Sequence, residues 1–247
     1  MTIRTEQEMQ SMQAVGRVVR AALEAMRRAV RPGISTAELD EVAHGVLESH
    51  GARSAPKLVY NFPGHTCISV NDEIVHGIPG ARVLQEGDLI KLDVTAEMNG
   101  FMADAACTVG VGKCSPEALR LVRCAQTAFR DAMKVAKAGA RACDVGRVIE
   151  RSARLQGFST IRELCGHGIG KTIHEPPTMP NYFDPGCRDV LREGMVVAIE
   201  PMVSAGSRRS VMDRDGWTVR TSDGSLAAHY EHTVVITKGK PIFLTAA

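Results

Sequence analysis

The chain contains no uninterrupted apolar stretch long enough to span a bilayer and no long run of charge of one sign. Lys and Arg together number 30 against 28 Asp and Glu, so the formal net charge is only +2. The pairs Arg27-Arg28 and Arg208-Arg209 are isolated pairs and not parts of a long basic run, which is typical of solvated surface positions. We therefore expect neither a nucleic-acid partner nor a membrane partner, because no basic or acidic segment marks one.

The cysteines show no pairing pattern. They are seven in number, scattered, and never in the Cys-x-x-Cys spacing. This composition argues against a disulfide framework and a zinc knuckle, and it favours reduced thiols. The N-terminus carries Glu6 and Glu8 and no apolar core segment, so no secretory signal is visible. We therefore predict a cytoplasmic protein.

What the chain does contain is an internal repeat. Residues 84–94 (LQEGDLIKLDV) match residues 191–201 (LREGMVVAIEP) at a shift of 107, which places Asp93 on Glu200. A second match, at a shift of 106, places Gly33, Leu39, Val42 and Gly51 on Gly139, Val145, Val148 and Gly157. Facing carboxylates repel unless a cation or a proton lies between them. The repeat therefore indicates a bound metal near a pseudo-twofold axis.

The predicted elements follow the same repeat. Capping signals and helical spacing of apolar residues predict helices at about 5–30, 35–51, 115–139 and 144–156. Short apolar stretches between Gly, Pro and Asn predict strands over most of 58–110 and 159–244. The order helix, helix, strands occurs twice, which is typical of an α+β fold with a mostly antiparallel sheet. We predict a single domain, residues 1–247, made of two related halves at about 1–110 and 111–247.

Two carboxylates are predicted to share one face of a β-hairpin. Asn99-Gly100 is a strong signal for a two-residue turn, and this turn pairs Thr95 with Asp104. Asp93 points to the same face as Thr95 because side chains alternate along a strand. Asp93 and Asp104 are then diagonal neighbours with Cα atoms about 7–8 Å apart, close enough to converge on one cation. The alternative is a pair of solvent-facing acids, but the neighbouring segment 89–92 favours burial.

Three further residues complete a candidate ligand set. Glu200 ends the apolar run 195–199, and Glu231 lies in a second strand-like run, 230–236. A buried glutamate is uncommon unless it is paired. His167 is flanked by glycines, which let the backbone approach another group closely. A lone histidine is more often structural than a ligand, yet four acids and one histidine suit two hard or borderline divalent ions.

His76 and His174 each precede the acid-bearing strand of their own half, so they could contact either the substrate or the ligands. The segment 165–172 nearly fits a phosphate-binding loop. Cys165 replaces its first glycine, however, and Pro176-Pro177 forbids the helix that must follow. We therefore do not expect nucleotide binding.

Taken together, these stretches resemble the bacterial-type (type I) methionine aminopeptidases over nearly the whole chain. The resemblance rests on CISVN at 67–71, HGIP at 76–79, LDVT at 92–95, GHGIG at 166–170, HEPP at 174–177, IEPMV at 199–203 and YEHT at 230–233. It implies the pita-bread fold and removal of the N-terminal methionine from peptides and nascent chains, with transient ribosome contact possible. The sequence does not fix the oligomeric state, and we expect a monomer.

The resemblance also implies roles for particular residues. Two divalent ions (Co, Mn, Fe, Zn or Ni) would be held by Asp93, Asp104, His167, Glu200 and Glu231, with Asp104 and Glu231 bridging. His76, His174 and Glu200 would be catalytic, His76 and His174 contacting the substrate. The remaining substrate contacts, in or near the methionine pocket, would come from Phe62, Cys67 and Trp217.

Two departures from the family pattern concern the pocket. The loop before Cys67 is FPGHT at 62–66, where a Tyr-Pro-Lys-Ser-like sequence is common, and Ile173 stands where an aromatic residue often occurs. Both leave the metal ligands untouched but bear on the pocket's side-chain preference. The alternatives are an Xaa-Pro-directed peptidase of the same fold, which carries an extra N-terminal domain, and a non-catalytic binding relative, which would have lost ligands.

Overall fold

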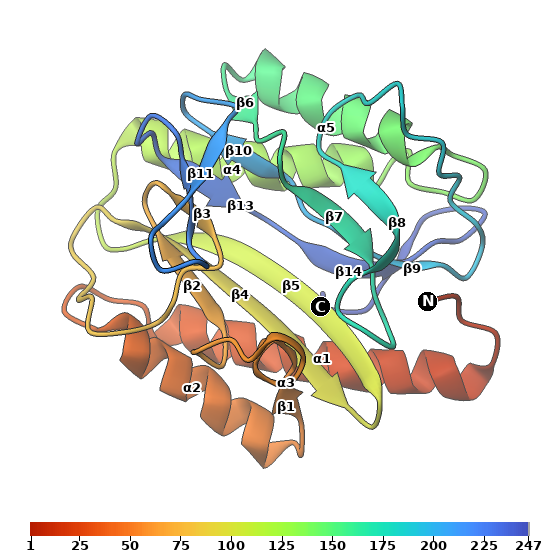
Figure 1. Ribbon diagram of the computed structural model, residues 1–247, viewed down its shortest axis with the longest axis horizontal. Helices are drawn as coiled ribbons and strands as arrows, with labels where there is room; N and C mark the ends of the chain where they lie inside the picture. The colour runs from red at the N-terminus through yellow and green to blue at the C-terminus, as the bar shows by residue number, and fades with distance from the viewer. Residues whose placement is uncertain (247) are drawn as a thin grey trace.

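Three helices begin where the capping signals predict, with N-caps at Thr5, Ser35 and Ser115, in the computed structural model, which describes residues 1–246. Thr5 and Ser35 each form a capping box, in which the side-chain oxygen accepts from the N–H of Glu8 or Glu38 and that glutamate accepts from the cap's own N–H. The helices are α1 (Glu6–Ala29), α2 (Thr36–Ser49), α3 (Ala55–Tyr60), α4 (Pro116–Ala132) and α5 (Ala142–Leu155) (Figure 1).

Two of the predicted boundaries were wrong. The helix expected to reach residue 139 ends at Ala132, because the N–H groups of Ala138 and Gly139 donate to Thr237 and Leu191 in distant segments. Residues 58–60 were expected in a strand but belong to α3. That helix is capped by Ser54, has a proline in its first turn and ends at Asn61 in the left-handed conformation.

Every strand pair in residues 1–246 is antiparallel, as predicted. In one half β4 pairs with β5 on one edge and with β2 and β1 on the other, and in the second half the order is β15-β14-β9-β7-β8. Two small sheets, β13-β10-β6 and β11-β12-β3, complete the fold. The strands are β1 (Arg53–Ser54), β2 (Cys67–Val70), β3 (Glu73–Val75), β4 (Leu89–Met98), β5 (Phe101–Gly110), β6 (Ser159–Thr160), β7 (Cys165–Gly168), β8 (Glu175–Pro180), β9 (Val196–Ile199), β10 (Met202–Ser204), β11 (Ser210–Met212), β12 (Val219–Thr221), β13 (Ala227–His229), β14 (His232–Val235) and β15 (Ile242–Phe243).

The two large sheets join along β5 at the centre of the molecule, where β5 lies beside β13 and β14 (Figure 1). The Glu231 N–H donates to the Ala106 carbonyl at 2.9 Å, and the Ala106 N–H donates back to the Glu231 carbonyl at 3.4 Å. On one side of this pair the Thr233 hydroxyl bridges to the backbone of Asp104. On the other side the Thr108 hydroxyl bridges to the backbone of His229. The junction therefore fixes, through the backbone, three residues that surround the site described below.

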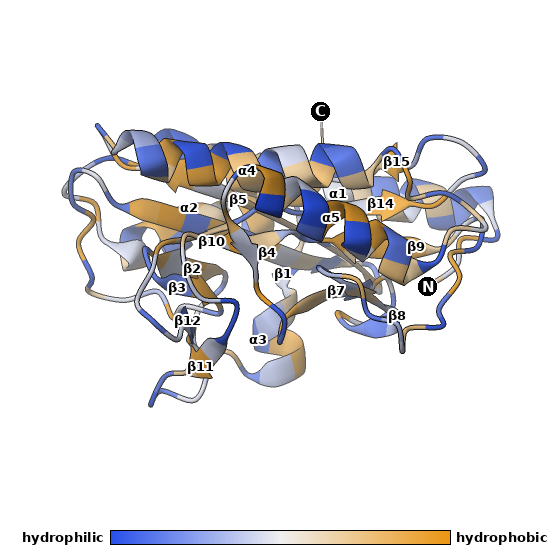
Figure 2. Cartoon of the chain, turned by 90° about the horizontal axis from the view of Figure 1, so that it is seen from above, coloured by the Kyte–Doolittle hydropathy of each residue, from blue (hydrophilic) through white to orange (hydrophobic). Residues whose placement is uncertain are grey.

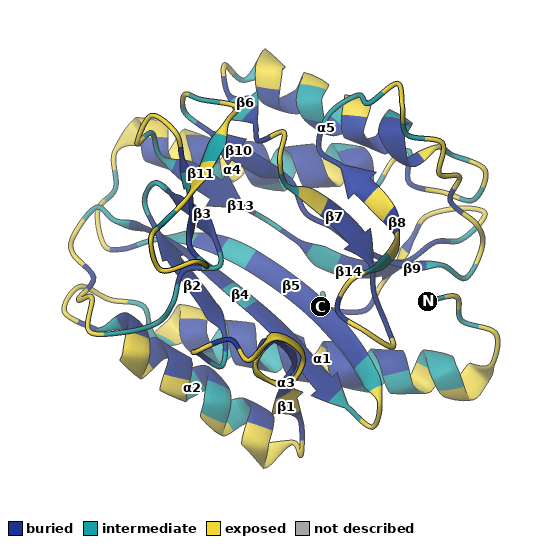
Figure 3. Ribbon diagram, viewed as in Figure 1, coloured by how far each residue is buried: buried dark blue, intermediate teal, exposed yellow. Residues whose placement is uncertain are grey.

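The core crosses the boundary between the halves. Helix α1 packs on β4 and β5, and the same apolar cluster includes Ile169, Val196 and Val235 from the C-terminal half. Burial of each such side chain contributes about 1.5–3 kcal/mol. The central strands are buried while the helices expose their outer faces (Figure 3). Helix α3 and the β11–β12 hairpin project on the side of the strands opposite to α4 (Figure 2). None of the helices in residues 1–246 has the length and apolar character of a membrane span.

Candidate metal centre and substrate cavity

The β4–β5 hairpin has the predicted register. Met98 pairs with Phe101 and Thr95 with Asp104, and both turn residues are left-handed, with φ of 53° at Asn99 and 78° at Gly100. Asp93 and Asp104 line the same cavity. The prediction that the two carboxylates share one face of the hairpin is confirmed.

Glu200 and Glu231 lie directly opposite each other in two facing breaks of the sheet. The pairs Ile199↔His232 and Met202↔His229 bracket them and set this register. Glu231 was expected inside a strand, and that prediction was wrong, because its backbone N–H and carbonyl pair with Ala106 across the junction. Pro201 interrupts the facing strand because it has no N–H to donate.

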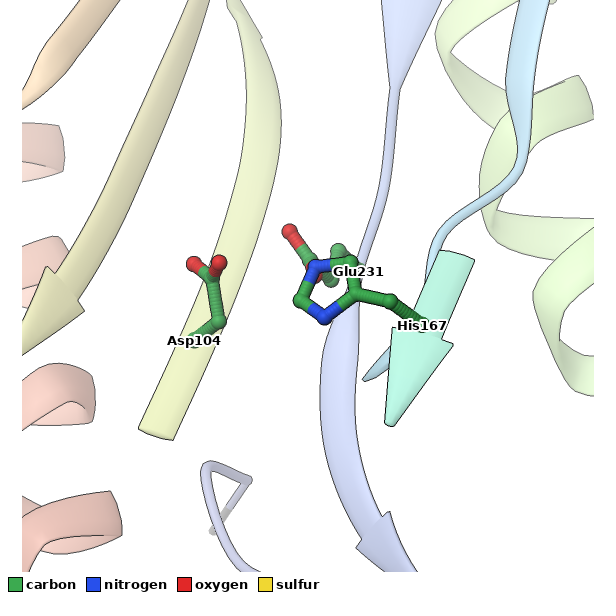
Figure 4. Close-up of side chains that lie close together, drawn as sticks. All are labelled: Asp104, His167 and Glu231. Atoms are coloured by element: carbon green, nitrogen blue, oxygen red, sulfur yellow. The ribbon is translucent and has the colours of Figure 1, made fainter. Parts of the chain in front are cut away.

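His167 lies in β7 and approaches the carboxylates through Nε2. Its Nδ1 lies 3.0 Å from the Gly168 carbonyl, so Nδ1 carries the proton and Nε2 keeps its lone pair. Nε2 is 3.5 Å from Oε1 of Glu200. Asp104, Glu231 and His167 converge on one space from β5, the β13–β14 break and β7 (Figure 4). The neighbouring Gly166 is required here, because a Cβ would lie 2.4 Å from the Ala198 carbonyl oxygen.

The ionised forms of these buried carboxyl groups are electrostatically unfavourable. Burial, reinforced by the neighbouring carboxylates, raises the pKa of Asp93 and Glu231 well above the usual range. Burial likewise raises the pKa of Asp104, against the opposing effect of His167, and it raises that of Glu200 to about 8. Oδ1 of Asp104 and Oε1 of Glu231 are buried and have no hydrogen-bond partner among residues 1–246. Unpaired buried oxygens beside an unprotonated imidazole nitrogen are a donor set that fits divalent cations.

A cavity of about 750 Å³ opens over these groups. It brings together the three residues expected near a methionine pocket, since Phe62, Cys67 and Trp217 all line it. Phe62 and Cys67 are only 3% and 6% exposed, and the rings of Phe62 and Trp217 meet edge to face with centroids 5.2 Å apart. Ile173 also lines the cavity and is buried. One part of the wall is therefore apolar and the other is acidic.

Loop 62–66, whose sequence departs from the family pattern, is tightly anchored. The Asp40 carboxylate on α2 accepts hydrogen bonds from the backbone N–H groups of His65 and Thr66 and from the Thr66 hydroxyl. Gly64 packs so closely on Pro79 that a Cβ would lie 2.4 Å from the proline Cγ. This contact excludes a side chain at position 64, and the loop holds Phe62 against the cavity.

His76 and His174 face the cavity from opposite segments. His76 is held in the left-handed region, with φ of 58°, by Gly77, whose backbone packs against β2 and hydrogen-bonds to Ile68. The His174 ring centroid lies 4.3 Å from that of His167. Burial, and then the neighbouring imidazoles, lower the pKa of both His76 and His174 to about 4, so both rings are neutral near pH 7.

Two residues at the site escaped prediction. The Tyr60 hydroxyl lies 2.6 Å from Nδ1 of His174, and it was missed because α3 was not predicted. His229 is 1% exposed and forms a second candidate cluster with Glu200 and Glu231. Alternation along a strand offers a signal for His229, since it lies two residues before Glu231. Burial lowers the pKa of His229 to about 4.

The family model described as metallopeptidase family M24 matches residues 10–238, and the chain belongs to that family. Over 247 residues the chain is 44% identical to methionine aminopeptidase 2 of Bacillus subtilis, with 99% of each sequence covered. It is 42% identical to the methionine aminopeptidase of Clostridium perfringens, with 98% of each covered.

The fold is the pita-bread fold. The crystal structure of methionine aminopeptidase from Thermotoga maritima superposes with a TM-score of 0.96 at 39% identity, and 100% of both chains is covered. Prolidase from Pyrococcus furiosus superposes with a TM-score of 0.80 at 22% identity, covering 100% of this chain and 66% of that one. At that identity the prolidase likeness shows the fold alone.

Proposed function

We propose that the chain is a methionine aminopeptidase that removes the N-terminal methionine from peptides and nascent proteins. One observation carries the proposal: buried carboxylates from both halves and one imidazole meet at the floor of a cavity with an apolar wall. This combination occurs in a chain 44% identical over 247 residues to a protein named methionine aminopeptidase.

We propose that Asp93, Asp104, His167, Glu200 and Glu231 would hold two divalent ions. The partnerless oxygens of Asp104 and Glu231 support this assignment. The raised pKa values support it too, because cations replace the protons that these carboxyl groups otherwise retain. When bound, Co, Mn, Fe, Zn or Ni would supply Lewis-acid chemistry at this site, lowering the pKa of a water molecule and polarising the scissile carbonyl.

The surrounding residues transfer the proton, stabilise the oxyanion and bind the substrate. Glu200 accepts the proton of the attacking water and passes it to the leaving amine. The Tyr60 hydroxyl donates to Nδ1 of His174, which leaves the Nε2–H of that ring free to stabilise the developing oxyanion. His76 contacts the substrate amide. Asp93 would bind the free α-amino group, which would make the enzyme act at the chain end.

The pocket formed by Phe62, Cys67 and Trp217 selects the methionine side chain, whose flexible thioether packs well against aromatic rings and a thiol. Because loop 62–66 is anchored through Asp40 and bears no side chain at Gly64, we propose that the pocket is pre-formed rather than closed by substrate.

We propose further that the protein is a monomeric type I enzyme of the cytoplasm that meets its substrates through transient ribosome contact. By the family resemblance, type II enzymes carry a helical insertion between the positions of Glu200 and Glu231. The type I assignment is supported because this connection contains strands β10 to β13 and no helix. The compartment is supported by seven free cysteines within the described residues.

An assay of peptide cleavage tests the proposal. Purified protein loaded with Mn(II), Co(II) or Fe(II) should release methionine from Met-Ala-Ser and should leave Xaa-Pro peptides without an N-terminal methionine intact. Release from Xaa-Pro peptides alone would assign the chain to the proline-directed peptidases. Inactivity with every metal would favour a non-catalytic binding protein.

A further inference from the structure

A second imidazole faces the carboxylate cluster from the interior of the protein. His229 ends β13, and its backbone N–H and carbonyl both bond to the Thr108 hydroxyl on β5 at 2.8 Å. On its other edge His229 pairs with Met202 in β10. The ring is therefore carried by a strand fixed on both edges. It lies outside the set of described residues that line the cavity.

The ring nitrogen Nε2 is nearly equidistant from the two facing glutamates. It lies 3.5 Å from Oε2 of Glu200 and 3.6 Å from Oε2 of Glu231. Glu200 thus lies between two imidazoles, with Oε1 beside His167 on the cavity side and Oε2 beside His229 on the interior side. Each oxygen of this carboxylate has one imidazole neighbour.

The position of the ring proton separates the roles of the two histidines. A neutral imidazole carries one N–H. In His167 that proton is on Nδ1, because the Gly168 carbonyl accepts from it. In His229 neither nitrogen has a hydrogen-bond partner in residues 1–246, and only Nε2 lies beside carboxylates. The two carboxyl groups are the acceptors that face Nε2, so we assign the ring proton to Nε2, and a protonated Nε2 has no lone pair for a metal.

We propose that His229 is a positioning residue: with the ions bound, its Nε2–H donates to the Oε2 atoms of Glu200 and Glu231, which lie 3.5 and 3.6 Å away in this structure, and so holds their other oxygens toward the ions. This inference rests on the metal centre of the proposed function. A hydrogen bond to an ionised carboxylate stabilises the ionised form that ligation requires. Losing such an outer partner typically weakens metal affinity ten- to a hundredfold.

The test compares His229→Leu, which removes the donor, with His229→Gln, which keeps an N–H donor. Titration calorimetry of the metal-free proteins with Mn(II) should show affinity weakened roughly tenfold or more in H229L and restored to within a few-fold of wild type in H229Q. At saturating Mn(II), kcat of H229L should fall with KM unchanged, because the substrate pocket is intact. His229→Asn, whose amide is too short to reach the glutamates, provides a second loss variant should H229L fail to fold.

His232 supplies a matched control. It follows Glu231 directly, but its ring nitrogens lie beside the hydroxyls of Thr245 and Tyr230 rather than the carboxylates. His232→Gln should leave Mn(II) affinity unchanged.

Two results would overturn the proposal. Wild-type Mn(II) affinity in both H229L and H229N would show that the hydrogen bond does not position the glutamates. Loss of an imidazole from the Co(II) coordination sphere of H229Q, measured by X-ray absorption, would make His229 a ligand. A wild-type protein that binds Mn(II) tightly but releases no methionine would contradict the proposed function alone, because the affinity comparison does not depend on catalysis.

Discussion

At the scale of single residues, the site is built from groups that are unfavourable without a ligand. Burial raises the pKa of four carboxyl groups, and neighbouring carboxylates raise it further at Asp93, Glu200 and Glu231. Two of the buried oxygens have no partner in the described chain. The shared position of Asp93 and Asp104 could be predicted from the sequence, because a two-residue turn fixes both the strand register and the face on which each side chain lies. The place of Tyr60 could not be predicted, because its contact with His174 joins segments more than 100 residues apart, which no local pattern encodes. His229 had a local signal in its place two residues before Glu231, but its contact with Glu200, about 30 residues away, had none.

Replacing Asp93 tests separately how the acid cluster affects stability and how it affects metal binding and activity. We expect Asp93→Ala to lower kcat/KM by roughly a thousandfold or more and to weaken Mn(II) binding, because a ligand is lost. The metal-free variant should unfold at the same temperature as wild type or higher, because one repelling buried carboxyl group is removed. Calorimetry and peptide assays check both effects, with exposed Glu117→Ala as control. Full activity in D93A would refute the assignment.

Removing the Tyr60 hydroxyl tests the orientation of His174. In Tyr60→Phe the partner of Nδ1 is lost, so the ring is no longer held with Nε2–H toward the cavity. We expect kcat to fall about tenfold while metal content and the affinity for Mn(II) stay unchanged. An unchanged kcat would show that His174 does not need this hydrogen bond.

At the scale of elements, local sequence signals predicted where helices start, whereas tertiary contacts determined where helices and strands end. The capping boxes at Thr5 and Ser35 and the cap at Ser115 are local chemistry, and the helices begin there. The end of α4 and the break at Glu231 depend on partners far along the chain, so sequence reasoning misjudged both. The prediction that no helix follows the phosphate-loop look-alike is confirmed, because strand β8 follows Thr172.

The turn that presents His76 should be intolerant of a single methyl group. In Gly77→Ala the new Cβ would lie 2.4 Å from the Ile68 carbonyl oxygen and 2.8 Å from the Ser69 Cα. We expect a loss of about 1–3 kcal/mol in the free energy of unfolding and a lower kcat/KM, because the backbone that carries His76 must shift. The control is Gly80→Ala, whose Cβ meets nothing within 4 Å. Equal behaviour of the two variants in urea unfolding would contradict this reading.

At the scale of the whole molecule, the two halves form one core around a shared site. Helix α2 (Thr36–Ser49) and helix α5 (Ala142–Leu155) begin and end at positions 106 apart, the shift of the second sequence match. We propose on this basis that the chain is a single domain of two related halves. The backbone hydrogen bonds between Ala106 and Glu231 join the large sheets of the two halves and place the acids at this junction.

The pH dependence of stability follows from the raised pKa of Glu200. The folded metal-free protein holds that proton up to a pH of about 8, whereas the unfolded chain releases it near 4.5. The stability contributed by the proton is therefore complete below pH 4.5 and is lost as the pH rises toward 8. Relative to Glu200→Gln, metal-free wild type should lose about 2 kcal/mol between pH 6.5 and 8.

Comparison with E200Q cancels the effects of the other titrating groups, and chemical denaturation in the presence of a chelator provides the measurement. Saturating Mn(II) should abolish the loss. A difference between wild type and E200Q that grows in favour of wild type over this pH range would contradict the prediction.

The most direct test of the metal centre is a crystal structure grown with Mn(II) and recorded at a wavelength where manganese scatters anomalously. We predict two anomalous peaks, both within bonding distance of Asp104 and Glu231, with His167 beside one and Asp93 beside the other. A cavity without such peaks, or peaks bound by other residues, would contradict the account.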